Sequence, residues 1–216
     1  MLTDSNSYFS VPHEFNVYLE PWDKRLPLPN DDQLRQMQST GLKLLSEVKA
    51  LEANCLLQLR QLDSETKAIV DFLKLQSRKI DLVLQHVIEK EAQSGIQYKG
   101  YQFGGSGLSV MSDKPFNIGD LFKAHIYLHN EVVAVLCICE VTQSSLRPIP
   151  PSSTHKTSSS HISPDNFSAK EPAEQWQTEL AFNQILDEDV EQLVKASLTV
   201  QQKMLKLRKQ HRKDTL

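Results

Sequence analysis

The feature that most constrains this 216-residue chain is a helical pattern of apolar residues that runs from Asn30 to Ser94. No glycine or proline interrupts residues 42–94, so nothing in that stretch forces a helix to end. Heptad-like spacing sustained over this length is typical of coiled coils and helical bundles. The positions that recur at alternating steps of three and four residues are called the heptad seam: Leu34, Met37, Gly41, Leu44, Val48, Leu51, Cys55, Leu59, Leu62, Thr66, Ile69, Leu73, Gln76, Ile80, Val83 and Val87.

Residues 31–94 are expected to form either one very long helix or a helical hairpin broken near residue 63. Asn30 is the expected N-cap, and Asp63 with Ser64 is suited to end one helix and cap another. The heptad seam also changes phase between Cys55 and Leu59. An isolated helix of this length would leave its apolar side exposed to water. The segment must therefore pack within the chain, or bind a protein partner or a second copy of the chain, and the sequence leaves these alternatives open.

Composition excludes several classes of protein. The net charge of -3 is mild, so bulk charge predicts neither DNA binding nor membrane binding. Cys55, Cys137 and Cys139 fit no disulfide framework and no zinc pattern, and the latter two are expected to be buried free thiols. The first residues lack the pattern of a secretion signal, and no apolar run is long enough to span a bilayer. These features predict a cytoplasmic protein.

Strand patterns flank the helical segment. Phe15, Val17 and Leu19 alternate with polar residues, which predicts a half-buried strand in an N-terminal region, residues 1–30, that ends in a proline-rich arm. Gly95 is the expected C-cap of the helical segment. Further strands are expected over residues 96–103, 108–111, 121–128, 131–141 and 176–182, with a tight hairpin turn at residues 129–130.

Two stretches near the C-terminus differ in character from the strands. Residues 144–174 hold five of the ten prolines and many serines, which predicts a flexible insertion within one domain. A helix with acidic residues in its first turn is expected from Leu186. The main domain is therefore expected over residues 95–205, followed by a basic tail over residues 206–216.

The order of these elements resembles the PilZ domain family. Three of the seven glycines, Gly104, Gly105 and Gly107, mark a tight turn between two strands. The resemblance implies an α+β fold, a small antiparallel six-stranded β-barrel with a C-terminal helix, here preceded by a long coiled-coil-like helical extension. It is carried by residues 104–110 (GGSGLSV), 118–128 (IGDLFKAHIYL), 132–142 (VVAVLCICEVT) and 180–190 (LAFNQILDEDV).

The resemblance also implies cyclic di-GMP signalling. PilZ domains usually bind that nucleotide with an RxxxR motif before the first strand, whose guanidinium groups hold phosphates, and a D/N-x-S-x-x-G motif on the barrel. Here no RxxxR motif precedes the barrel, and only Gly107 matches the second motif, with Gln102 and Gly104 at its Asp/Asn and Ser positions. If cyclic di-GMP is a ligand of this chain, the residues expected to contact it are Lys99, Gln102, Gly104, Ser106 and Gly107.

No spacing of residues points to catalysis. The glycine cluster is not followed by the Gly-Lys-Ser/Thr of a P-loop, and Leu108 stands where a G-x-S-x-G elbow has its last glycine. We therefore expect no enzyme, no metal and no cofactor. Two functions remain. One is a degenerate or atypical PilZ receptor or adaptor of the cyclic di-GMP pathway that acts by protein–protein interaction. The other is a structural coiled-coil oligomerisation protein whose small β domain caps a bundle.

Overall fold

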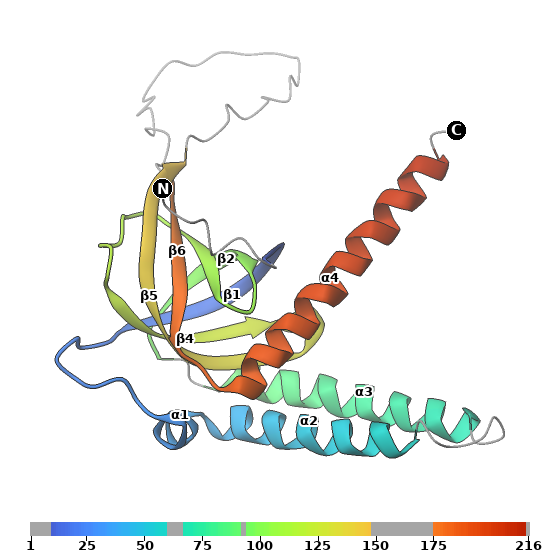
Figure 1. Cartoon of the computed structure of the whole chain (residues 1–216). Coiled ribbons are helices and arrows are strands. Elements are labelled where there is room, and N and C mark those ends of the chain that lie inside the picture. The colour runs from blue at the N-terminus through green and yellow to red at the C-terminus, as the bar shows by residue number, and fades with distance from the viewer. Residues whose placement is uncertain (1–9, 60–66, 92–93, 148–174, 215–216) are drawn as a thin grey trace, which may run out of the picture.

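The strands close into a barrel of six antiparallel strands with the helices on its outside (Figure 1). This is seen in a computed structural model that describes residues 10–59, 67–91, 94–147 and 175–214. The order around the barrel is β1-β2-β3-β6-β5-β4, and β4 pairs with β1 to close it. The predicted fold class is confirmed. The strands are β1 (Val11–Pro21), β2 (Ile96–Phe103), β3 (Gly107–Ser112), β4 (Leu121–Leu128), β5 (Val133–Arg147) and β6 (Gln175–Gln184).

Strand β1 is part of the barrel itself. It pairs with β2 on one edge and with β4 on the other, although the whole helical segment separates it from both in the sequence. The predicted alternation is confirmed, because Phe15, Val17 and Leu19 are buried in the barrel core. Only five of the six strands were expected within residues 95–205, and β1 supplies the sixth.

The helical segment folds as a hairpin preceded by a short separate helix. Helix α1 (Asp31–Met37) begins with a capping box in which Asn30 and Gln33 bond each other's backbone N–H groups, so the predicted N-cap is confirmed. Gln38 then takes an extended conformation and ends α1. Ser39 Oγ accepts a hydrogen bond from Leu42 N at the start of α2 (Thr40–Leu59). The predicted break near residue 63 lies outside the described residues, and α3 (Lys67–Lys90) follows it.

Polar contacts fix α2 antiparallel to α3. At one end, Glu91 accepts hydrogen bonds from Ser39 Oγ (2.5 Å) and Gly41 N (2.6 Å). Further along, Lys49 Nζ lies 2.5 Å from Asp81 Oδ1. Residues 39 and 41 thus contact residue 91, whereas residue 49 contacts residue 81. Residue numbers rise along α2 as those of their partners fall along α3, so the two helices are antiparallel. Figure 1 shows the two helices lying side by side beneath the barrel.

The hairpin covers part of the outer face of the barrel and creates a second apolar core. Tyr127 and Leu136 of the barrel lie in this core with Leu42, Leu84 and Ile88 of the hairpin. As a result β4 and the first half of β5 are buried on both faces. His125 is buried on the hairpin side of the barrel, although histidine is a polar residue, and neither ring nitrogen has a hydrogen-bond partner within the described structure.

The heptad seam, in contrast, is largely exposed. The side chains that pack on the barrel lie one residue further along each helix: Leu42 and Leu45 on α2, Leu84 and Ile88 on α3. The extended Gln38 interrupts the helix between α1 and α2, so the heptad spacing does not continue from one helix to the next. The buried residues therefore do not all lie on one continuous seam. The large apolar seam residues that remain exposed are Leu44, Leu51, Ile69, Leu73, Ile80, Val83 and Val87.

Several element boundaries also differ from the predicted ones. The β4–β5 connection is a 3-10 turn, η2 (His129–Glu131), and its left-handed residue is Val132 (φ 53°) rather than Asn130. Helix α3 ends at Lys90, so Gly95 (φ 93°) is not its C-cap; a Cβ there would meet Leu19 O at 2.6 Å. Residues 144–147 belong to β5, and α4 (Asp187–Asp214) extends through most of the predicted basic tail.

The buried His125 makes stability depend on pH. Burial lowers the pKa of His125 from 6.5 to about 4, helped by Lys123 and opposed by Glu20 and Glu91. Between these two values the unfolded chain binds a proton at this residue that the folded chain does not, so His125 costs no stability above pH 6.5 and lowers stability as the pH drops toward 4. The loss should reach about 3 kcal/mol.

Urea unfolding at pH 7.5 and pH 5 measures this effect. We expect the His125→Gln variant to lose less stability than the native chain on acidification, and His86→Gln, at an exposed position on α3, to lose as much as the native chain. Equal pH dependence in the native chain and the His125→Gln variant would show that His125 is not responsible.

Candidate functional site

The glycine turn between β2 and β3 is the first candidate site. Gly104 N donates a hydrogen bond to Gly107 O (3.0 Å), which makes the turn tight, and Phe182 N of β6 donates to Ser106 O (3.0 Å). The predicted turn is therefore present, with Gly104 buried and Ser106 exposed. The turn is anchored to β6 by its backbone.

The glycines of this turn allow close approach of other parts of the chain. A Cβ on Gly105 would lie 2.8 Å from Val194 Cγ2, which belongs to α4. A Cβ on Gly107 would lie 2.3 Å from Leu180 O, a backbone atom that cannot move aside. Helix α4 thus packs directly on the turn, and the glycines have a structural role whether or not a ligand binds here.

The other two predicted ligand residues are held by the N-terminal strand region. Lys99 Nζ donates to Asn16 Oδ1 (2.9 Å), and Gln102 Nε2 donates to Ser10 Oγ (2.5 Å). They therefore bind different residues of the N-terminal region, at separate points along β2. The structure brings Gly104, Ser106 and Gly107 together in one turn and gives Lys99 and Gln102 partners of their own.

A cation on β5 that contacts an aromatic ring of β2 was missed in the sequence. The Arg147 guanidinium lies 5.9 Å from the centre of the Tyr101 ring, at the end of β5. Burial is the main cause of the raised pKa of the Tyr101 hydroxyl. Arg147 belongs to residues 144–174, which were predicted to be a flexible insertion. Its contact with Tyr101 joins residues 46 positions apart, so the neighbouring residues in the sequence could not predict it.

The two barrel thiols are not suited to chemistry at neutral pH. Cys137 and Cys139 are buried free cysteines in the barrel core, as predicted, whereas Cys55 is exposed. Burial raises the pKa of Cys139 to about 12 and that of Cys137 well above its ordinary value. A thiolate is the reactive and metal-binding form, so both groups behave as small apolar side chains. The described residues also contain no cluster of three or more His, Cys, Asp or Glu that could hold a metal ion.

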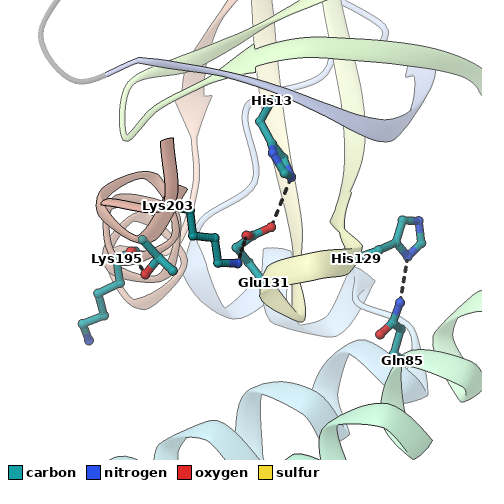
Figure 2. A network of polar contacts seen from close by, with 7 residues as sticks. His13, Gln85, His129, Glu131, Lys195 and Lys203 are labelled. Atoms are coloured by element: carbon teal, nitrogen blue, oxygen red, sulfur yellow. Dashed lines mark hydrogen bonds and ion pairs between the residues drawn. The ribbon is translucent and has the colours of Figure 1, made fainter. Parts of the chain in front are cut away.

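A network of polar contacts around η2 joins three parts of the chain (Figure 2). The side chain of Glu131 is 3% exposed, and its carboxylate lies 3.1 Å from His13 Nε2 of β1 and 3.0 Å from Lys203 Nζ of α4. On the other side of the turn, the His129 ring lies 3.1 Å from the amide nitrogen of Asn16 and 3.4 Å from that of Gln85 on α3. The turn thereby fixes β1, α3 and α4 relative to one another. None of these residues was singled out in the sequence, because their partners are distant along the chain.

Comparison with known proteins gives matches only among solved structures. No family model matches the chain, and no curated protein sequence matches it. One solved structure is a protein from Xanthomonas campestris, described as a new tetrameric PilZ domain self-assembled via an unusual helical bundle. It has a TM-score of 0.48 and 10% sequence identity, with 93% of this chain and 91% of that chain covered.

Two further matches are structures of MrkH. One is K. pneumonia MrkH in its apo state, with a TM-score of 0.38 and 12% identity over 53% of this chain and 43% of that chain. The other, described as a c-di-GMP-dependent transcription regulatory factor, has a TM-score of 0.34 and 15% identity over 49% of this chain and 40% of that chain. All three matches have TM-scores below 0.5 and identities of 10–15%, and they are similarities of fold alone. In the part of the chain that the structure describes, no helix is long and apolar enough to cross a membrane.

The structural role of the glycine turn can be tested by substitution. Gly107→Ala should destabilise the chain by about 2 kcal/mol or more, because the added methyl group would overlap the β6 backbone. Ser106→Ala, one position earlier and exposed, should change the free energy of unfolding by about 0.5 kcal/mol or less. Chemical denaturation compares the two variants, and equal stability would show that the turn tolerates side chains.

Proposed function

We propose that this chain is an atypical PilZ-type adaptor of cyclic di-GMP signalling that assembles through its α2–α3 hairpin and acts by binding other proteins. The observation that carries this proposal is the exposed heptad seam on α3. Val83 is 63% exposed, Ile80 48% and Val87 41%, although each stands at a position that heptad spacing marks as apolar. A sustained seam of this kind is expected to meet another helix.

On α3, the seam residues Ile80, Val83 and Val87 stay exposed in the folded hairpin. On α2, the hairpin does use the seam, since Gly41 N donates to Glu91 and Val48 packs against the second core. Lys49 and Asp81 join the two helices from positions off the seam. The contacts of α3 with the barrel come from residues such as Leu84 and Ile88. The α3 part of the seam is therefore free to serve an intermolecular contact.

A second copy of the chain is the partner that best fits the seam. Fully burying one large aliphatic side chain contributes roughly 1.5–3 kcal/mol. Two copies of α3 packed seam to seam would bury Ile69, Leu73, Ile80, Val83 and Val87 from each chain. Because these side chains are 41–63% exposed, the remaining gain is about 8–15 kcal/mol for the two chains. This is comparable to the roughly 4–15 kcal/mol that association costs in lost freedom of motion.

Features of the glycine turn support an adaptor over a conventional nucleotide receptor. Gly104 offers no side chain at the serine position of the family motif, and α4 packs against Gly105. Lys99 and Gln102 are already engaged by Asn16 and Ser10. If cyclic di-GMP binds in another mode, we propose that it contacts Lys99, Gln102, Gly104, Ser106 and Gly107.

The exposed seam also supports the second candidate, a structural oligomerisation protein in which the barrel only caps a bundle. That candidate needs no ligand and no partner other than copies of the chain. It is distinguished from an adaptor by whether the barrel or α4 binds a different protein.

Assembly through the seam can be tested with two neighbouring residues of α3. Val83→Asp puts a charge on the seam and should reduce the mass of the assembled chain, measured by light scattering, to that of a monomer. Leu82→Asp makes the same change at a residue that is also exposed (52%) but lies off the seam. It should leave the mass of the assembly unchanged. A native chain that stays monomeric at high concentration, or equal effects of the two substitutions, would contradict the proposal.

Calorimetry with cyclic di-GMP tests the nucleotide part of the proposal. We expect no binding tighter than about 10 μM, because the usual arginine pair is missing. Micromolar or tighter binding that is lost in a Lys99→Ala, Gln102→Ala double variant would instead identify the chain as a receptor.

A further inference from the structure

We propose that the groove between α4 and the α2–α3 hairpin binds an acidic peptide segment of a partner protein. The groove has a volume of about 320 Å³ and lies where α2, the η2 turn and α4 meet. Its floor includes Val132, Val133 and Ala196, and its sides carry Lys49, Lys195 and Lys203. One carboxylate, that of Glu131, also lines the groove and is paired with Lys203. This inference rests on the proposed adaptor function, since it names the chemistry of the partner that the adaptor would bind.

The groove is a fixed feature of the fold. Val132 takes a left-handed conformation, and its side chain is buried in the second core. Its neighbour Glu131 is held by His13 and Lys203, as Figure 2 shows, so the floor of the groove is anchored to β1 and α4. On the facing side, Asp81 and Glu52 hold Lys49 in place. A site whose walls are already ordered loses little freedom of motion when a ligand binds.

The lysines differ in how readily they could bind a new anion. Lys195 is paired only with Glu191 across one helical turn, and both side chains are more than 70% exposed. Such a pair contributes about 0–1 kcal/mol, so Lys195 can exchange its partner at little cost. Lys203 is 56% exposed, and His13 would still contact the Glu131 carboxylate if Lys203 turned toward a ligand. Lys49 is already neutralised and contributes mainly its position on the wall.

The spacing of the cations favours a peptide over a compact phosphate. Lys195 and Lys203 lie eight residues apart on α4, which is about 12 Å along the helix. A single phosphate cannot reach both, whereas carboxylates about four residues apart on an extended peptide can. The groove is lined by the middle of α4 and not by its N-terminus, where backbone N–H groups would favour a phosphate. The apolar floor suits aliphatic side chains placed between the carboxylates.

Fluorescence anisotropy with a labelled peptide tests the proposal on the full chain. The probe is a peptide of roughly eight alternating Glu and Leu residues, long enough to span both lysines. A matched peptide with Gln in place of Glu, and AMP as a competitor, test whether carboxylates are what the groove recognises.

Two double variants of α4 provide the matched comparison. Lys195→Glu with Thr199→Glu changes two residues that line the groove, and it leaves Lys203 and Glu131 intact. Lys206→Glu with Gln202→Glu makes the same change in charge, with the same four-residue spacing, at exposed positions outside the groove lining. Thermal unfolding of both variants checks that each still folds.

The expected result is that the groove variant weakens peptide binding by about tenfold or more, while the control variant changes it by less than about twofold. The Gln peptide and AMP should bind the native chain at least tenfold more weakly, by the same reasoning. Equal losses in the two variants would show unspecific charge attraction and overturn the proposal. Absence of peptide binding, or AMP binding as tight as that of the peptide, would also overturn it.

The same measurement on the Val83→Asp chain separates this inference from the proposed assembly. Peptide binding that persists in a monomeric Val83→Asp chain would show that the groove acts independently of the seam. A chain that assembles through the seam but binds no peptide would refute the groove alone. A chain that binds the peptide but never assembles would refute the assembly alone.

Discussion

The pairing of β1 with β2 is the constraint on which the rest of this structure depends. Leu19 lies opposite Ile96 in the register of the two strands, so the chain must return to its starting point after the whole helical segment. One continuous helix over residues 31–94 would be about 95 Å long and could not return. Two antiparallel helices of similar length bring the chain back to the barrel. The closed barrel therefore requires the hairpin, and the hairpin is an insertion between two neighbouring strands.

This arrangement determines which faces are buried. The hairpin starts and ends beside β1, so it lies against the outer face formed by β1, β4 and β5, where Tyr127 and Leu136 meet Leu84 and Ile88. That contact uses one face of α3 and leaves the seam at Ile80 and Val83 exposed. The same contact also buries His125 without a hydrogen-bond partner in the described structure. Stability of the barrel and availability of the seam are thus two consequences of one packing arrangement.

Local patterns in the sequence predicted the strands, the capping by Asn30 and the turn at Gly104 and Gly107, because each depends on neighbouring residues. The buried face of the hairpin was not predictable. Heptad spacing identifies an apolar stripe, but which stripe meets the barrel is decided by pairing between strands far apart in the chain. The left-handed Val132 also escaped prediction, since a β-branched residue in that conformation is held by packing from distant helices. The ion pairs of Glu131 could not be predicted for the same reason, because its partners His13 and Lys203 lie on β1 and α4, far away in the sequence.

Amide hydrogen exchange at several protein concentrations tests most directly whether the exposed seam is an interface between copies of the chain. If the seam is an interface, amides of α3 should exchange more slowly as concentration rises, because assembly suppresses local opening of the helix. Amides of β5, which pairs with β4 and β6 in the barrel wall, should exchange at a constant rate. Exchange of α3 that is independent of concentration, up to the highest concentration at which the chain stays in solution, would contradict the account.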